Sequence, residues 1–415
     1  MSLLKELKES FDKFGERSGD LLKEGLLDLL NKTQQRLNDA CCKGGECDPL
    51  ANNDKRDEAH GAFMEAADFF FRNGYMAAAD SLLIEWWNKL GDRQFLEEQR
   101  VYRAKISFKL AELYLRRNDR GAAFWWALHT QADDMLGEHP EGGGSGKLQL
   151  RTILGMSEEA LVGFNKIATR NVSSLKDSTV TWAQPLGFAE DVVLQFALEN
   201  PKFASLLAQD TSVLEFPLSS AYFKALLAVV NASYSNKETT AKGKSLERLA
   251  AYLFLLMPGW IPHLNIEDED QAFESDIVVH NFMQPSNLAA EVLGRDFLVE
   301  CKNWKNSVGV SSVGYFLHRM HLTHAKFGII FALHETSGGS APKELNNERA
   351  ALKLRYKSFH EDGSICIVVS ESDLADLADG KVTFWQLLFN KIEQVRFGVQ
   401  KGPKIEPART AQETL

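Results

Sequence analysis

Two charged residues, Glu300 and Lys302, lie two positions apart in the apolar segment 296–304, DFLVECKNW. Its apolar and aromatic residues predict a strand, and alternate residues of a strand face the same way. Both charges therefore lie on one face, while Cys301 faces a core. Asp276 begins another apolar run, DIVV, and reaches the same face if the two strands pair. Because burying a lone charge is costly, the pattern indicates that these charges act together.

Such a cluster suits hydrolysis of a phosphodiester with the help of a divalent cation. Mg²⁺ prefers hard oxygen ligands, and Asp276, Glu300 and the backbone carbonyl of Cys301 would supply them, for Mg²⁺ or Mn²⁺. A cation held there makes water a better nucleophile. Lys302 would orient that water and offset the negative charge that develops on phosphorus. Glu247, on a preceding helix, is a fourth candidate, expected to serve a second cation or to support the first ligands.

The order of these elements resembles the PD-(D/E)xK restriction-endonuclease-like superfamily, and within it the Mrr-type branch. The resemblance is carried by the helix GKSLERLAAYLFLLMPGW, an acidic turn ESD, the strand FLVECKNW followed by VG, a helix, and FGIIFA followed by the loop ETSGG. It covers residues 236–395, about two fifths of the chain. The resemblance implies a mixed sheet between helices, a metal-dependent endonuclease activity, double-stranded DNA as substrate, and Asp276, Glu300 and Lys302 as the catalytic residues.

The sequence departs from the family pattern around the first strand of the motif. The interval from Asp276 to Glu300 is long, which implies an insertion in segment 283–296. Ser275 stands where many members have proline. Glu274 lies on the same face as Asp276 and is a rival for the ligand on this strand, although Asp276 fits the motif better.

Upstream of this region, apolar residues recur at helical spacing with few runs typical of strands. Segments 66–80 and 110–124 resemble each other at an offset of 110 − 66 = 44 residues, with alanines at equivalent positions. This resembles a tetratricopeptide-like helical hairpin, with Asn118 in place of the turn glycine, and a helical bundle without repeats stays open. Four tryptophans in these helices could stack on bases, but their alanine-rich surroundings predict a core: Trp86, Trp87, Trp125 and Trp126.

We predict a multidomain α and α/β protein: an N-terminal all-α helical domain and a C-terminal restriction-endonuclease-like domain with a mixed α/β/α sheet. The glycines of 141–146, EGGGSG, predict a flexible surface loop. The polar segment 235–244 marks the main boundary. The expected parts are amphipathic helices at 1–50, the helical domain at 51–235, the nuclease domain at 236–400 and a disordered tail at 401–415.

Composition limits the classes of protein further. The formal net charge of −10 argues against a general polyanion binder, although basic residues outnumber acidic ones locally within 301–360. No apolar run is long enough to span a membrane, and the N-terminus lacks the features of a secretory or transit peptide. We therefore expect a cytoplasmic protein without membrane contact.

Cysteine and histidine usage gives no strong metal signal. Five cysteines, an odd and low number, argue against a disulfide framework. The cluster Cys41, Cys42 and Cys47, upstream of His60, matches no common zinc spacing, so free thiols are expected. Three histidines spaced three residues apart follow the motif, and a surface or groove position is expected for them rather than metal ligation: His318, His321 and His324.

The sequence leaves two alternatives to a DNA endonuclease. The same site could cleave RNA, because the chemistry at phosphorus does not depend on the sugar. The nuclease-like half could also be an inert interaction scaffold, although an idle site has no reason to keep a buried charged cluster. A symmetric homo-oligomer is expected if both DNA strands are cut. The helical domain would sense a trigger or a protein partner, as in bacterial anti-phage effectors.

Overall fold

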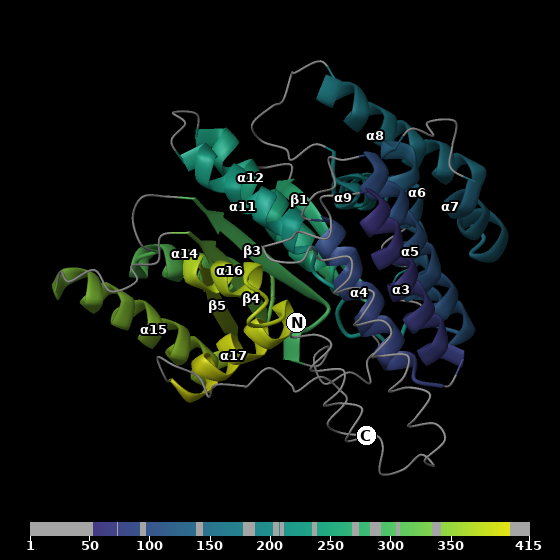
Figure 1. Cartoon of the computed structure of the whole chain (residues 1–415). Helices are drawn as coiled ribbons and strands as arrows, with labels where there is room; N and C mark the ends of the chain where they lie inside the picture. Colours follow the sequence, from purple (N-terminus) through teal and green to yellow (C-terminus); the bar gives the residue numbers. More distant parts are fainter. Residues whose placement is uncertain are drawn as a thin grey trace, which may run out of the picture.

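The computed structural model describes residues 53–72, 74–91, 97–137, 144–176, 187–201, 207, 211–234, 239–267, 274–282, 292–303, 308–333 and 342–398. The predictions for 1–50, for 401–415 and for the Cys41, Cys42 and Cys47 cluster lie outside these residues. Figure 1 shows helices in the first half of the chain and one sheet flanked by helices in the second, as predicted. Among the described helices, none combines the length and hydropathy needed to cross a bilayer.

The first half consists of helices. They are α3 (Asn53–Arg72), α4 (Met76–Gly91), α5 (Glu97–Arg116), α6 (Arg120–Leu136), α7 (Gly144–Leu148), the π-helical turn η1 (Gln149–Ile153), α8 (Glu158–Lys176), α9 (Ala189–Glu199) and α11 (Ser220–Tyr234). The pairs α3–α4 and α5–α6 form two successive hairpins, in which each helix contacts the next.

The two similar segments, 66–80 and 110–124, hold the turns of these two hairpins. Gly74 and Asn118, which are 44 residues apart, both have positive φ, at 83° and 60°. The hydrogen bonds also match: the Tyr75 N–H donates to the Phe70 carbonyl at 2.8 Å, and 44 residues later Asp119 donates to Tyr114 at 2.9 Å. Asn tolerates the left-handed conformation that Gly adopts freely, which explains the replacement. The hairpins therefore repeat each other, and their assignment to the tetratricopeptide class stays a prediction.

The prediction of a flexible loop at 141–146 is wrong for residues 144–146, which begin α7. A Cβ added at Gly146 would lie 2.6 Å from the backbone nitrogen of Gln131 on α6. The glycine thus permits a close contact between two helices. Composition alone cannot distinguish a glycine in such a contact from a glycine in a loop.

The four tryptophans are core residues, as predicted. Trp86, Trp87, Trp125 and Trp126 are at most 3% exposed. The Trp125 ring stacks on Phe216 with centroids 4.6 Å apart. Because no ring face is open to solvent, none of the four is available to stack on a base.

The second half is built on a five-stranded sheet in the order β1-β2-β3-β4-β5. The strands are β1 (Trp260–Glu267), β2 (Glu274–Asn281), β3 (Asp296–Lys302), β4 (Phe327–Ala332) and β5 (Ile365–Ser370). The pairs β1–β2 and β2–β3 are antiparallel, whereas β3–β4 and β4–β5 are parallel. The sheet is therefore mixed, as predicted.

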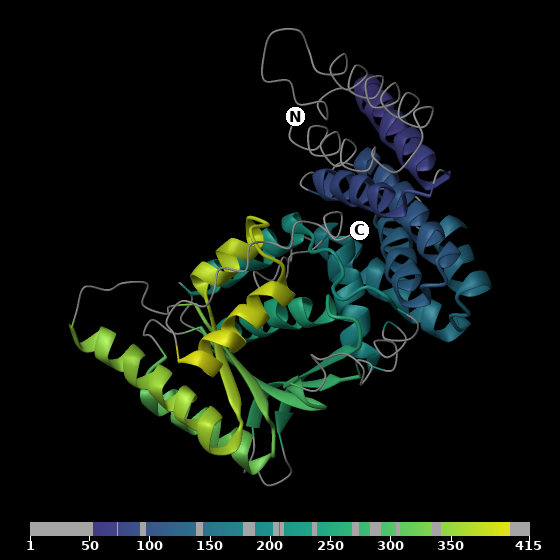
Figure 2. The same ribbon diagram turned by 90° about the horizontal axis from the view of Figure 1, so that it is seen from below.

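Helices cover both faces of the sheet. α12 (Thr239–Leu255), α16 (Glu371–Ala378) and α17 (Phe384–Phe397) share one core with Ile277, Val299 and Cys301. α14 (Val310–Leu322) and α15 (Pro342–Asp362) form a second core on the other face, with Val278 and Leu298. Figure 2 shows the sheet between these two layers. The alternation along β2 and β3 thus decides which side chains face α12 and which face α14.

Several elements differ from the sequence predictions. β1 was not predicted, because Pro262 and Asn265, which has a φ of 52°, interrupt the pattern of a strand. The whole ESD segment, described as an acidic turn, belongs to β2, the strand predicted from the apolar run that begins at Asp276. α12 begins at Thr239, within the polar segment taken as a boundary, and helices α16 and α17 were also not predicted.

The two halves share one continuous core, which extends from Phe63 in α3 to Val395 in α17. Just before α11, the Phe216 N–H donates to the Leu256 carbonyl at 2.7 Å. Glu215 accepts hydrogen bonds from the first two backbone N–H groups of α17, at 2.9 and 3.0 Å. The segment that leads into α11 therefore caps a helix near the C-terminus.

Candidate active site

Asp276 and Glu300 lie where the pairing of β2 and β3 ends. The last paired residues are Ile277 and Val299, so continuing the register by one residue places Asp276 opposite Glu300. At this position the Cys301 N–H donates to Oδ2 of Asp276 at 2.6 Å. A carboxylate thus takes the place of the next backbone acceptor and is fixed beside Glu300.

Glu300 is buried, at 6% exposed, and each of its oxygens meets a cation. Oε1 pairs with the Lys302 ammonium, and Oε2 accepts a hydrogen bond from Nη1 of Arg319 at 2.7 Å. Alternation places Asp276, Glu300 and Lys302 on the face that α14 covers. The structure therefore brings together the three residues of the predicted motif.

Arg319 is a member of this cluster that the sequence analysis did not single out. It lies in α14, is 7% exposed, and follows Phe316 by three residues on the face of the helix that packs on the sheet. A charged residue among buried apolar positions was the available signal, because arginine is seldom buried without a partner. The partner is Glu300.

The electrostatics of Asp276 reflect its burial and the neighbouring carboxylate of Glu300. Burial, followed by the negative charge of Glu300, raises the pKa of Asp276 to about 6. The Cys301 N–H, Lys302 and Arg319 oppose this change without cancelling it. Additional positive charge at this place would therefore stabilise the ionised form of Asp276.

Glu247 approaches β3 from the other face of the sheet. It lies on α12, which packs on the face that carries Cys301, and it is 6% exposed. Burial, and then the charges of Asp276, Glu247 and Glu300, raise the pKa of the Cys301 thiol. Glu247 also lines an open pocket of about 510 Å³ together with Lys244, Arg248 and residues 262–266 of β1. Its charge acts on Cys301 together with those of Asp276 and Glu300, so Glu247 lies close to the motif.

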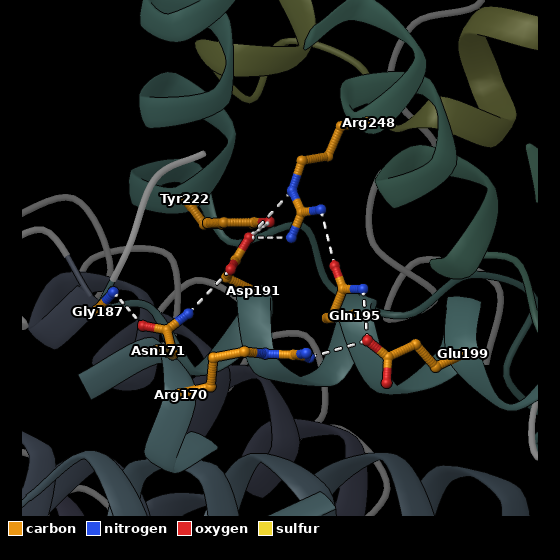
Figure 3. Close-up of polar contacts among 8 residues, drawn as sticks. All are labelled: Arg170, Asn171, Gly187, Asp191, Gln195, Glu199, Tyr222 and Arg248. Carbon is orange, nitrogen blue, oxygen red and sulfur yellow. Dashed lines mark hydrogen bonds and ion pairs between the residues drawn. The ribbon is translucent and has the colours of Figure 1, made fainter. Parts of the chain in front are cut away.

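A network of polar side chains holds α12 against the preceding helices (Figure 3). The Arg248 guanidinium donates to Oδ1 of Asp191 at 2.6 and 3.2 Å and to Gln195 at 3.0 Å. Tyr222 donates its hydroxyl proton to the same Asp191 oxygen at 2.7 Å. Asp191 on α9 is fully buried and is thus a shared partner of Tyr222 on α11 and Arg248 on α12.

A second set of contacts joins the end of β3 to the same helices. Asn303, which directly follows Lys302, donates its amide to Oγ of Ser233 on α11 at 3.2 Å. Oγ of Ser233 lies 2.9 Å from Oγ of Ser245 on α12. All three residues are buried. The helices of the first half therefore contact the strand that carries the motif.

A divalent cation fits the donor set on chemical grounds. Within the part of the chain that the structure describes, no group of three or more His, Cys, Asp or Glu residues could hold a metal ion. The histidines in and just after α14 are exposed and belong to no such group: His318, His321 and His324. Mg²⁺, however, is commonly bound by one or two carboxylates with water and substrate phosphate. Asp276 and Glu300 provide two carboxylates, which lie side by side where the pairing of β2 and β3 ends.

Residues 239–354 match the family model Mrr_cat, described as a restriction endonuclease. The C-terminal half therefore contains a restriction-endonuclease-like domain. The match begins at the first residue of α12, includes β1 to β4, and contains the motif from Asp276 to Lys302. Comparisons with curated proteins and with solved structures give no significant match. The predicted resemblance is thus confirmed for this half of the chain.

Proposed function

We propose that the protein is a metal-dependent endonuclease that hydrolyses phosphodiester bonds of double-stranded DNA. The observation that carries the proposal is the placement of Asp276 and Glu300 side by side, with Lys302 against Glu300. This cluster lies inside the segment that matches a restriction endonuclease. A scaffold without activity would have no use for charges that are costly to bury.

Each residue of the cluster has a distinct role in this proposal. Asp276, Glu300 and the carbonyl of Cys301 would hold Mg²⁺ or Mn²⁺, which when bound activates water and neutralises charge on the phosphate. Lys302, whose ammonium lies against Glu300, would stabilise the negative charge that develops on a phosphate bound beside these carboxylates. Glu247 would support the site from the α12 side of the sheet, through the packing around Cys301.

We further propose that the helical half regulates this activity by sensing a trigger or a protein partner, as an anti-phage or restriction-type effector would. Support comes from the contact of Asn303 with Ser233, because a change in α11 would reach the residue that follows Lys302. Cleavage of both strands by a chain with one such cluster would use two copies of the protein.

The test is incubation of purified protein with supercoiled plasmid in the presence of Mg²⁺, Mn²⁺ or EDTA. We expect metal-dependent linearisation by the wild type and at least ~100-fold slower cleavage by Lys302→Ala, because one electrostatic stabiliser is lost. Lys381→Ala is the matched control, since Lys381 is exposed and pairs with Asp376 and Asp379 near the end of α16. It should cleave as the wild type does.

The same assay with a structured RNA distinguishes the two nucleic acids. Metal-dependent cleavage of the RNA with an intact plasmid would replace DNA by RNA as the substrate. Full plasmid cleavage by Lys302→Ala would remove Lys302 from the chemistry. No cleavage of either substrate under any metal condition would refute the proposed activity.

A further inference from the structure

Glu300 is held by two cations, only one of which belongs to the motif. Lys302 comes from the same strand, whereas Arg319 comes from α14 and makes a 2.7 Å hydrogen bond to Oε2. The Arg319 guanidinium also lies over the ring of Tyr315, at 5.6 Å from the centroid. The Arg319 side chain is 8% exposed, the same fraction as that of Glu300. The pair is therefore largely shielded from solvent.

The charges of this cluster balance. Asp276 and Glu300 contribute two negative charges when ionised, and Lys302 and Arg319 contribute two positive charges. A divalent cation gains less free energy from a neutral cluster than from one with net negative charge. It would also have to share Glu300 with a guanidinium that already occupies one of its oxygens. Arg319 thus opposes the binding of a cation to the two carboxylates.

We propose that Arg319 competes with a divalent cation for Glu300, and that a substrate phosphate relieves the competition by giving the guanidinium a second anionic partner. This inference rests on the proposed nuclease function and adds to it a positioning residue and a binding order. The cation alone binds weakly, and the cation with a phosphodiester binds well.

The argument for the phosphate follows from the burial of Arg319. When a buried guanidinium loses its carboxylate, the uncompensated charge strongly destabilises the protein unless another anion replaces the carboxylate. Phosphate accepts hydrogen bonds from arginine in the same forked geometry as carboxylate does. A phosphodiester is the anion that the proposed substrate brings to this cluster. Cation and phosphate must then strengthen the binding of each other equally.

The experiment measures Mn²⁺ binding by calorimetry, without nucleic acid and with a short phosphorothioate DNA duplex that is cleaved slowly. Three proteins are compared: the wild type, Arg319→Gln, and the control Arg396→Gln. Arg396 pairs with Glu393 on α17, on the opposite side of the sheet, so the control loses the same charge away from the cluster. We expect Arg319→Gln to bind Mn²⁺ alone about tenfold more tightly, which equals about 1.4 kcal/mol.

The duplex provides the second readout. It should tighten Mn²⁺ binding to the wild type and to Arg396→Gln more than to Arg319→Gln, in which only direct ligation by the phosphate remains. Arg319→Lys, which keeps the charge but not the fork, should show intermediate Mn²⁺ affinity and keeps the test valid if Arg319→Gln unfolds. Unchanged or weaker Mn²⁺ binding by folded Arg319→Gln would overturn the competition.

The outcomes also separate this inference from the proposed function. A wild type that binds Mn²⁺ and cleaves DNA, beside an Arg319→Gln variant with unaltered Mn²⁺ affinity, would refute the role of Arg319 alone. Absence of Mn²⁺ binding by both proteins, with and without the duplex, would refute the competition and the metal-dependent activity together.

Discussion

Replacing Asp276 by asparagine should remove activity and yet stabilise the protein at alkaline pH. The pKa of Asp276 is about 6 in the folded protein, against an ordinary value of 3.8. The folded state therefore binds the proton more tightly than the unfolded chain does. The stability gained from this tighter proton binding is fully present below pH 3.8 and is lost as the pH rises through 6. At pH 8 the ionised carboxylate lowers the stability of the wild type.

The size of this effect follows from the two pKa values. The difference corresponds to roughly 3 kcal/mol, which we reduce to about 2 kcal/mol because Asp276 is only partly buried. Asparagine keeps an oxygen that can accept the Cys301 N–H bond. We therefore expect Asp276→Asn to raise the free energy of unfolding by about 2 kcal/mol at pH 8 and by about half of that at pH 5.

Urea denaturation of both proteins at pH 5 and pH 8, without metal, measures this difference. The control is Asp68→Asn, because Asp68 pairs with Lys109 at the surface and its loss should change stability by less than ~1 kcal/mol at either pH. A variant that is less stable than the wild type at pH 8, or one whose advantage grows as the pH falls, would show that Glu300 and burial do not raise the pKa of Asp276.

Three further predictions concern the surroundings of the site. Glu247→Ala should slow plasmid cleavage less than the loss of a motif carboxylate does, as measured in the same assay. Gly328→Ala should lower the melting temperature, at a cost of roughly 1–3 kcal/mol in stability, because the new Cβ would lie 2.6 Å from Met320 Sδ. Its control is Gly163→Ala in α8, where the new Cβ meets no atom within 4 Å, and this change should stabilise the protein by up to ~1 kcal/mol. Asp191→Ala should cost roughly 3–5 kcal/mol in urea denaturation, because it leaves the Arg248 guanidinium largely buried without its carboxylate.

The sequence predicted the elements that have a regular pattern. Alternation around Glu300 and Lys302 predicted β3 and placed both charges on one face, and the apolar run after Asp276 predicted β2. β1 was missed because Pro262 and the left-handed Asn265 break the pattern that identifies a strand. Pairing with β2, which no local pattern reports, makes this segment a strand.

The candidate site was predicted only as far as strand periodicity extends. Strand periodicity placed Asp276 with Glu300. It could not show on which face of the sheet Glu247 lies, since that depends on how α12 packs. Arg319 lies 319 − 300 = 19 residues beyond Glu300, and only the tertiary structure brings them into contact. Its helical spacing from Phe316, on an otherwise apolar face of the helix, was the one sign of its role in the local sequence.

The capping of α17 by Glu215 limits how the chain can be divided. A fragment that begins at residue 239, where the endonuclease match starts, lacks both this carboxylate and the helix that covers Tyr252. Such a fragment would expose aromatic surface and leave the first two N–H groups of α17 without the Glu215 acceptor, while the Thr383 cap would remain. Exchanging the helical half for that of another protein would therefore also require a substitute for these contacts, so the two halves are expected to have changed together during evolution.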